Sequence, residues 1–93
     1  MVTAIVLISA ERKKVNELAD YLANIPSISE VYSVAGRYDL IAIIRAPNNE
    51  RLAEIITSDI LKIEGVSKTE TLIALKCCSR FDLESIFGEM ITE

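Results

Sequence analysis

Apolar residues recur along the chain with two different spacings, one typical of strands and one typical of helices. Residues 2–8 form a strand pattern that is apolar on both faces and is bounded by Ser9. From Ser9 or Ala10 the spacing changes to that of an amphipathic helix, which ends before Pro26. The apolar stripe of this predicted helix consists of Val15, Leu18, Ala19 and Leu22.

A β-hairpin is predicted next. The short strand pattern of residues 31–35 is joined to the almost wholly apolar pattern of residues 40–44 by a turn that contains Gly36 and Asp39. Gly36 supplies a positive φ angle at little cost, and the Asp39 side chain can hydrogen-bond the turn backbone. Both residues are therefore typical of a turn, whatever further role they have.

The second half of the chain repeats the helix and strand spacings. The third strand ends near Arg45, and residues 47–49 break the pattern before a second helix. Gly65 marks the exit of that helix, and residues 68–76 predict a fourth strand that begins polar and becomes apolar. The residues at helical spacing are Leu52, Ile55, Ile56 and Ile60 or Leu61.

The resulting order, β-α-β-β-α-β, predicts a ferredoxin-like fold of the α+β class. With right-handed crossovers the strands take the order 4-1-3-2, all antiparallel, and both helices lie on one face of the sheet. The end of the first strand, the turn at residues 36–39 and the start of the fourth strand then share one edge.

The other face of this sheet is also apolar along the first and third strands. Ile5 and Leu7 alternate with apolar neighbours in the first strand, and Ile41 and Ile43 do so in the third. Soluble monomers do not tolerate an uncovered apolar face of this extent, and two helices cover only one side. We therefore expect an obligate homodimer in which two sheets pack face to face about a two-fold axis.

Residues 79–93 form a tail with its own pattern. Phe81 and Ile86 flank Asp82 as in a hydrophobic staple, which predicts a third, short helix. We therefore divide the chain into a domain at residues 1–78 and a C-terminal helical tail at residues 79–93. The tail's apolar stripe consists of Leu83, Ile86, Phe87, Met90 and Ile91.

Charge and cysteine content exclude several classes. Ten basic and fourteen acidic residues give a net charge of −4, and no basic run exceeds residues 12–14, so direct nucleic-acid binding by this chain is not expected. Cys77 and Cys78 are adjacent, without metal or redox spacing, which favours reduced thiols in a cytoplasmic protein. We expect neither a signal peptide nor a membrane span, because residues 1–10 lack a basic n-region and no apolar run approaches the roughly 20 residues that a span requires.

The sequence favours ligand binding over catalysis. It contains no histidine, and neither a nucleophile set, a phosphate loop nor a metal-ligand spacing can be assembled, so no catalytic residue, metal or cofactor is expected. A carboxylate could instead bind turn N–H groups, hydroxyls and the N-terminus of the first helix, while Asp39 accepts an ammonium group. The candidate residues for binding an amino acid at the shared edge are Ser9, Gly36, Tyr38, Asp39, Thr69 and Thr71.

Two motifs in combination resemble the effector-binding (RAM) domain of the Lrp/AsnC family. Residues 33–40 contain Gly-x-Tyr-Asp, and residues 63–71 contain Gly-Val-x-x-Thr-x-Thr; the resemblance covers residues 1–78. It implies a dimeric α+β barrel, dimers assembled into a ring that is typically an octamer, and small effectors, commonly amino acids, bound between dimers. The family's loop and strand motifs match Gly36, Tyr38, Asp39, Thr69 and Thr71.

Regulators of this family usually carry an N-terminal helix-turn-helix domain, whereas this sequence begins directly with a strand. It therefore resembles the stand-alone members, which act through full-length Lrp/AsnC regulators or as amino-acid sensors. Two alternatives share the element order. One is a small dimeric α+β-barrel enzyme of the monooxygenase type, against which the absence of His and Trp argues, and the other is an ACT-like regulatory domain.

Overall fold

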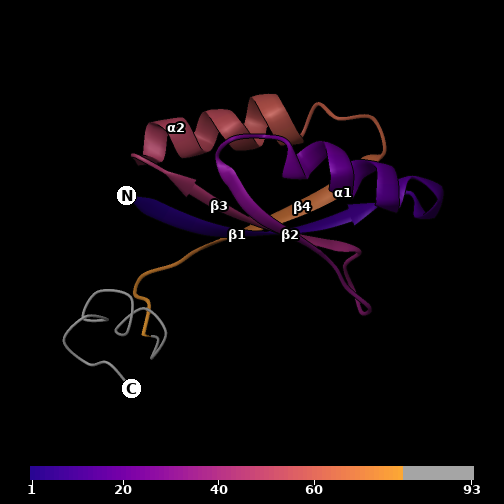
Figure 1. Ribbon diagram of the computed structural model, residues 1–93, viewed down its shortest axis with the longest axis horizontal. Coiled ribbons are helices and arrows are strands. Elements are labelled where there is room, and N and C mark those ends of the chain that lie inside the picture. Colours follow the sequence, from indigo (N-terminus) through magenta and orange to yellow (C-terminus); the bar gives the residue numbers. More distant parts are fainter. Residues whose placement is uncertain (79–93) are drawn as a thin grey trace, which may run out of the picture.

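The computed structural model describes residues 1–78, and the predicted tail helix lies outside the described residues. The chain forms a four-stranded antiparallel sheet with a layer of helices on one side (Figure 1). The elements are β1 (Val2–Ala10), η1 (Arg12–Lys14), α1 (Val15–Ala23), β2 (Ile28–Ser33), β3 (Leu40–Ala46), α2 (Asn49–Glu54), η2 (Ile55–Ile60) and β4 (Val66–Ile73).

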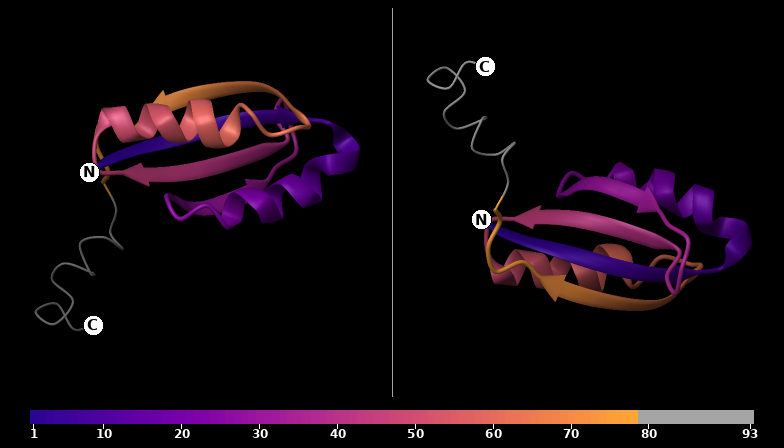
Figure 2. Two further views of the ribbon diagram at one scale, coloured as in Figure 1. Left: turned by 90° about the horizontal axis from the view of Figure 1, so that it is seen from above. Right: turned by 90° about the horizontal axis from the view of Figure 1, so that it is seen from below.

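The strand order is β2-β3-β1-β4, which confirms the predicted ferredoxin-like topology. All three strand pairings are antiparallel. The helices lie in front of the sheet when it is viewed from above, and the strands lie in front of them when it is viewed from below (Figure 2). We call the side without helices the open face.

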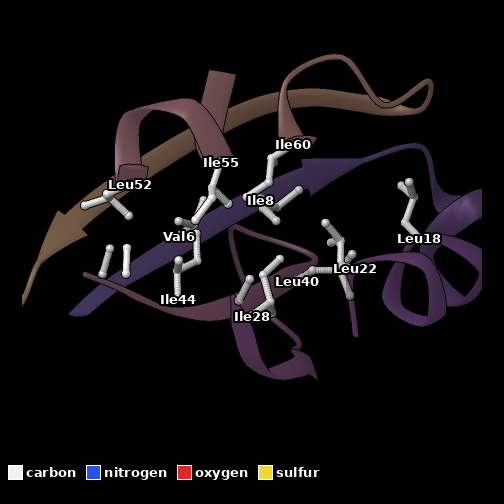
Figure 3. Close-up of a cluster of buried hydrophobic side chains, with 13 residues drawn as sticks. Val6, Ile8, Leu18, Leu22, Ile28, Leu40, Ile44, Leu52, Ile55 and Ile60 are labelled. Atoms are coloured by element: carbon white, nitrogen blue, oxygen red, sulfur yellow. The ribbon is translucent and has the colours of Figure 1, made fainter. Parts of the chain in front are cut away.

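The core lies between the sheet and the helix layer (Figure 3). Alternate residues of β1 and β3 point into it, as the period of two in a strand requires. Cross-strand pairs such as Val6 with Ala42 bring these side chains to the same level. The buried residues are Ala4, Val6, Ile8, Leu18, Leu22, Ile28, Leu40, Ala42, Ile44, Ala46, Leu52, Ile55 and Ile60.

The first helical segment begins later than predicted. A helix start at Ser9 or Ala10 is wrong, because β1 continues through a bulge between these residues to pair Ala10 with Val66. A 3-10 turn then forms at residues 12–14, and α1 begins only at Val15. The predicted apolar stripe is otherwise observed, with Leu18 and Leu22 buried.

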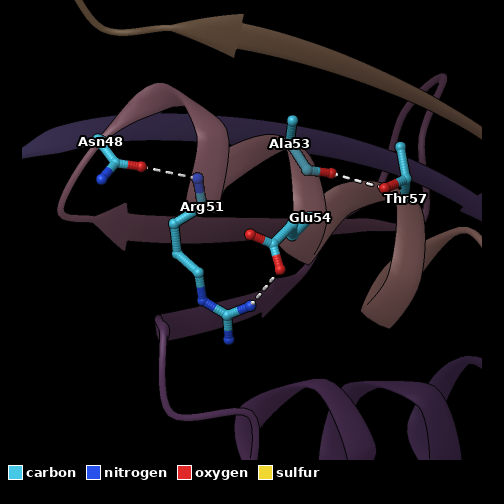
Figure 4. A network of polar contacts seen from close by, with 5 residues as sticks. All are labelled: Asn48, Arg51, Ala53, Glu54 and Thr57. Carbon is cyan, nitrogen blue, oxygen red and sulfur yellow. Dashed lines mark hydrogen bonds and ion pairs between the residues drawn. The ribbon is translucent and has the colours of Figure 1, made fainter.

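The second helix is not regular along its length. The Asn48 side chain caps α2 by accepting a hydrogen bond from the Arg51 N–H at 2.8 Å (Figure 4). From Ile55 the helix widens into the π-helical turn η2, in which the Leu61 N–H donates to the Ile56 carbonyl at 2.9 Å. This turn buries Ile60, whereas Leu61 remains 48% exposed.

Two strands are displaced from their predicted bounds. β2 spans Ile28–Ser33 instead of residues 31–35, because Ile28 pairs with Ile44 and is buried in the core. The connector to β3 consequently covers residues 34–39 and is longer than a tight two-residue turn. β4 begins at Val66, before the predicted residue 68, and ends at Ile73.

Candidate functional site

The candidate site lies where three segments meet at one end of the sheet. The end of β1, the connector at residues 34–39 and the start of β4 come together there, as the topology predicted. The Asp39 N–H donates to the Ile8 carbonyl at 2.9 Å, and the Ser67 hydroxyl donates to the Ser9 carbonyl at 3.0 Å. These bonds hold the connector and β4 against β1.

Asp39 joins the connector to β1 through its side chain as well. Its Oδ2 accepts a hydrogen bond from the Ala10 N–H at 2.9 Å, and its carbonyl accepts one from the Val34 N–H at 3.0 Å. The residue is half-buried. Within residues 1–78 the Oδ1 atom accepts no hydrogen bond, so one carboxylate oxygen is structural and the other is free to receive a ligand.

The connector that contains Asp39 also carries backbone N–H groups without a partner in the described part of the chain. The N–H groups of residues 35–38 donate to no acceptor within residues 1–78. Gly36 has a φ angle of +150°, and a Cβ placed on it would meet no atom within 4 Å. The glycine is therefore required by its backbone conformation and not by a close neighbour.

Tyr38 connects the same loop to β4. Its hydroxyl donates a hydrogen bond to Glu70 Oε1 at 2.7 Å, and this bond raises the pKa of Tyr38, while the Arg37 charge acts in the opposite direction. Glu70 pairs with Leu7 and therefore lies on the open face. We call the end of the sheet at which residues 34–39 lie the hairpin end. The Tyr38 phenol group thus reaches the open face at the hairpin end.

The two threonines lie on the other side of the sheet. Thr69 is paired with Ile8 and Thr71 with Val6, both of which point into the core under the helices. Cross-strand partners share a face, so both threonine side chains lie on the helix-covered face. The structure brings Ser9, Tyr38 and Asp39 to one end of the sheet, but Thr69 and Thr71 face away from Tyr38 and Glu70.

One N–H group at the start of the first helical segment is engaged by the protein itself. The Glu11 N–H donates to the Gly65 carbonyl at 2.9 Å, so this donor is not available to a ligand. Gly65 has a φ angle of +104°, and a Cβ there would lie 2.9 Å from the Lys14 Cδ atom. The loop before β4 therefore packs closely against the start of the helical segment.

Glu70 is the site residue that the sequence interpretation did not include. Its hydrogen bond with the Tyr38 hydroxyl joins residues 32 positions apart in the sequence. The parity of β4 was the available signal, because residues 68, 70 and 72 must share a face opposite to residues 69 and 71.

The open face itself is largely apolar. Ile5, Leu7, Ile41 and Ile43 are half-buried there, and Tyr32 and Leu72 are 49% and 45% exposed. Tyr32 donates a hydrogen bond to Glu30 on this face, which raises the pKa of Tyr32. The helices that cover the core leave this second apolar surface of the sheet uncovered within residues 1–78.

Two further features of the described residues bear on function. Residues 1–78 contain no group of three or more His, Cys, Asp or Glu residues placed to hold a metal ion. In the same part of the chain, no helix has both the length and the apolar character needed to span a bilayer.

Comparison with known proteins identifies the family. Residues 3–80 match the family model described as the Lrp/AsnC ligand binding domain. Because this match includes most of the chain, the protein belongs to that family, as the two sequence motifs indicated.

The curated relatives are named as transcriptional regulators. HTH-type transcriptional regulator FL11 of Pyrococcus furiosus is 39% identical over 75 residues, which are 81% of this chain and 49% of the regulator. The chain thus spans about half the length of the curated relatives it matches.

Solved structures show the same fold. TTHA0845 from Thermus thermophilus is 44% identical with a TM-score of 0.81, and the match covers 86% of this chain and 100% of that one. Transcriptional regulator NMB0573 from Neisseria meningitidis, solved as a complex with L-Met, has a TM-score of 0.77 and 16% identity, covering 84% and 52% of the two chains. At that identity the likeness to NMB0573 concerns the fold alone.

Proposed function

We propose that this Lrp/AsnC ligand binding domain senses an amino acid at its hairpin end. The observation that carries the proposal is the pairing of a free carboxylate oxygen, Asp39 Oδ1, with four unengaged N–H groups at residues 35–38. An amino acid presents an ammonium group and a carboxylate, which are the two groups that such an acceptor and such donors bind.

The remaining candidate residues have distinct roles in this proposal. Tyr38 and Glu70 form a hydrogen-bonded boundary on the open-face side, and Ser9 lies at the β1 bulge. Gly36 provides the backbone conformation of the donor loop. Thr69 and Thr71 lie on the helix-covered side of β4, so they form no part of the boundary made by Tyr38 and Glu70.

A second copy of the chain is part of the proposed function. The open face is apolar in its centre, and burial of such a surface is the main driving force for association. Two copies packed through their open faces form the functional unit, and dimers assemble further into a ring. The domain regulates transcription indirectly, by associating with full-length regulators of the same family.

The experiment that tests ligand binding is a thermal-shift panel of the twenty amino acids, followed by calorimetry on those that stabilise the protein. L-Met is included because NMB0573 was solved with it. A ligand at 100 times its dissociation constant stabilises the folded state by about 2.7 kcal/mol, which gives a measurable rise in Tm. A panel with neither a shift nor binding heat for any amino acid would contradict the proposal.

A further inference from the structure

The chain leaves the sheet on its open side after β4. The last ladder bond is donated by the Ala74 N–H to the Thr3 carbonyl at 2.9 Å. Beyond it the chain turns to the side opposite α1 and α2 (Figure 1). We call residues 74–78 the arm.

The arm carries an apolar side chain into solvent. Leu75 is 96% exposed, far more than the other exposed leucines within residues 1–78, Leu61 at 48% and Leu72 at 45%. The next residue, Lys76, is exposed as well. Leu75 is not buried in the core of its own copy, so its side chain can be removed from water only by contact with a surface that these residues do not supply.

Together with the sheet, the arm bounds a hollow of about 660 Å³ on the open face. The apolar part of the sheet wall is formed by Ile5, Tyr32 and Ile43, and Thr3 and Arg45 complete that wall. This hollow is continuous with the apolar surface that the proposed dimer buries. A second copy on the open face would therefore meet the arm directly.

We propose that the arm is a dimerisation element that packs Leu75 on the open face of a second copy. Charge complementarity also favours a second copy of the chain on this face. The open face of one copy presents the exposed carboxylates Glu30 and Glu70, and the arm of the other copy carries the positive charge of Lys76. In a two-fold dimer the contact occurs twice, so each substitution removes two leucines from the interface. This inference rests on the face-to-face packing given under the proposed function.

The test compares the full chain with its Leu75→Ser variant by analytical ultracentrifugation with a fluorescent label, over a nanomolar-to-micromolar dilution series. Leu61→Ser is the matched control, because it removes an exposed leucine near the helix layer. The dimer dissociation constant is expected to rise about 100-fold for Leu75→Ser, since two apolar contacts are lost, and to change less than about threefold for Leu61→Ser.

The outcomes distinguish the proposed role of the arm from the existence of the open-face dimer. A dimeric wild type whose dissociation constant changes less than about tenfold in Leu75→Ser would overturn the arm while leaving the open-face dimer intact. That result is also expected if the chain's own tail or another protein covers Leu75. A wild type that stays monomeric throughout would overturn the dimer itself. Far-UV circular dichroism verifies that both variants fold, which the exposure of Leu75 leads us to expect.

Discussion

The backbone N–H of Ala10 donates a hydrogen bond to the Asp39 carboxylate across 29 positions of sequence, at 2.9 Å. Ala10 is the last residue of β1 and follows a bulge in the pairing with β4. The Asp39 carboxylate accepts the hydrogen bond of its N–H group at this irregular position. The carboxylate therefore extends β1 by holding its end against the connector. The same side chain that we propose as ligand acceptor is thus part of the sheet's framework.

Two substitutions at Asp39 separate these roles. Asp39→Ala removes the acceptor of the Ala10 N–H and is expected to lower the free energy of unfolding by about 2 kcal/mol, the range for hydrogen bonds to charged groups. Asp39→Asn keeps an oxygen acceptor, so it should lose less than about half of that. Urea denaturation measures both values.

The ligand response of the same pair provides the second readout. Asp39→Asn lacks the negative charge that attracts an ammonium group, so the thermal shift given by the amino acid that stabilises the wild type should disappear. If Asp39→Asn retains the full shift, the carboxylate does not bind the ammonium group. Asp20→Asn, at an exposed position on α1, is the control for loss of a charge.

The hydrogen bond between Tyr38 and Glu70 predicts a pH dependence at alkaline pH. The phenol donates this bond, so the pKa of Tyr38 in the folded protein lies above the ordinary value of 10.0. The stabilisation is therefore fully present below the unfolded-state pKa and is lost as the pH rises through the folded-state pKa. Glu70→Ala should lower the pKa of Tyr38 toward 10.0.

Tyrosinate absorbance checks this prediction in a chain carrying Tyr21→Phe and Tyr32→Phe, which leaves Tyr38 as the remaining tyrosine. Glu70→Gln is the matched control, because its amide oxygen can still accept the hydrogen bond. An absorbance midpoint that does not move in Glu70→Ala would show that the bond does not persist in solution.

The Asn48 cap predicts a stability change away from the site. Asn48→Ala leaves the Arg51 N–H without its side-chain acceptor and should lower the free energy of unfolding by about 1 kcal/mol. Asn48→Asp, which retains an acceptor at the N-terminus of α2, should be close to wild type. Equal losses in the two variants, measured by urea denaturation, would exclude capping as the cause.

A charge on the open face should prevent association. Leu7→Glu places a carboxylate in the centre of the apolar surface, and burying it in a dimer would cost more than the dimer gains. We expect a folded monomer at concentrations where wild type is dimeric, as measured by sedimentation velocity. Leu61→Glu, near the helix layer, should remain a dimer, and dissociation of both variants alike would contradict the open face as the interface.

The sequence predicted the element order and the core because these depend on local periodicity. The helical stripe that includes Leu18 and Leu22 and the alternation within β1 and β3 are readable from neighbouring residues alone. The Gly36 turn was also predictable, since its backbone conformation requires glycine.

The details of the site depend on contacts that local patterns do not contain. The β1 bulge is held by a residue 29 positions away, so the sequence around Ser9 and Ala10 gave no sign that the strand continues. The face of Thr69 and Thr71 depends on strand register, and a shift of one residue reverses it. Leu72 and Ile73 are adjacent and both apolar, so the sequence did not indicate which residues of this strand face the helices.

The most direct test of this account is the mass of the intact chain in solution, measured by light scattering after size exclusion at micromolar concentration. The apolar open face predicts a mass of twice 10.3 kDa or a higher even multiple of it. A well-folded species of 10.3 kDa that shows no tendency to associate would contradict it.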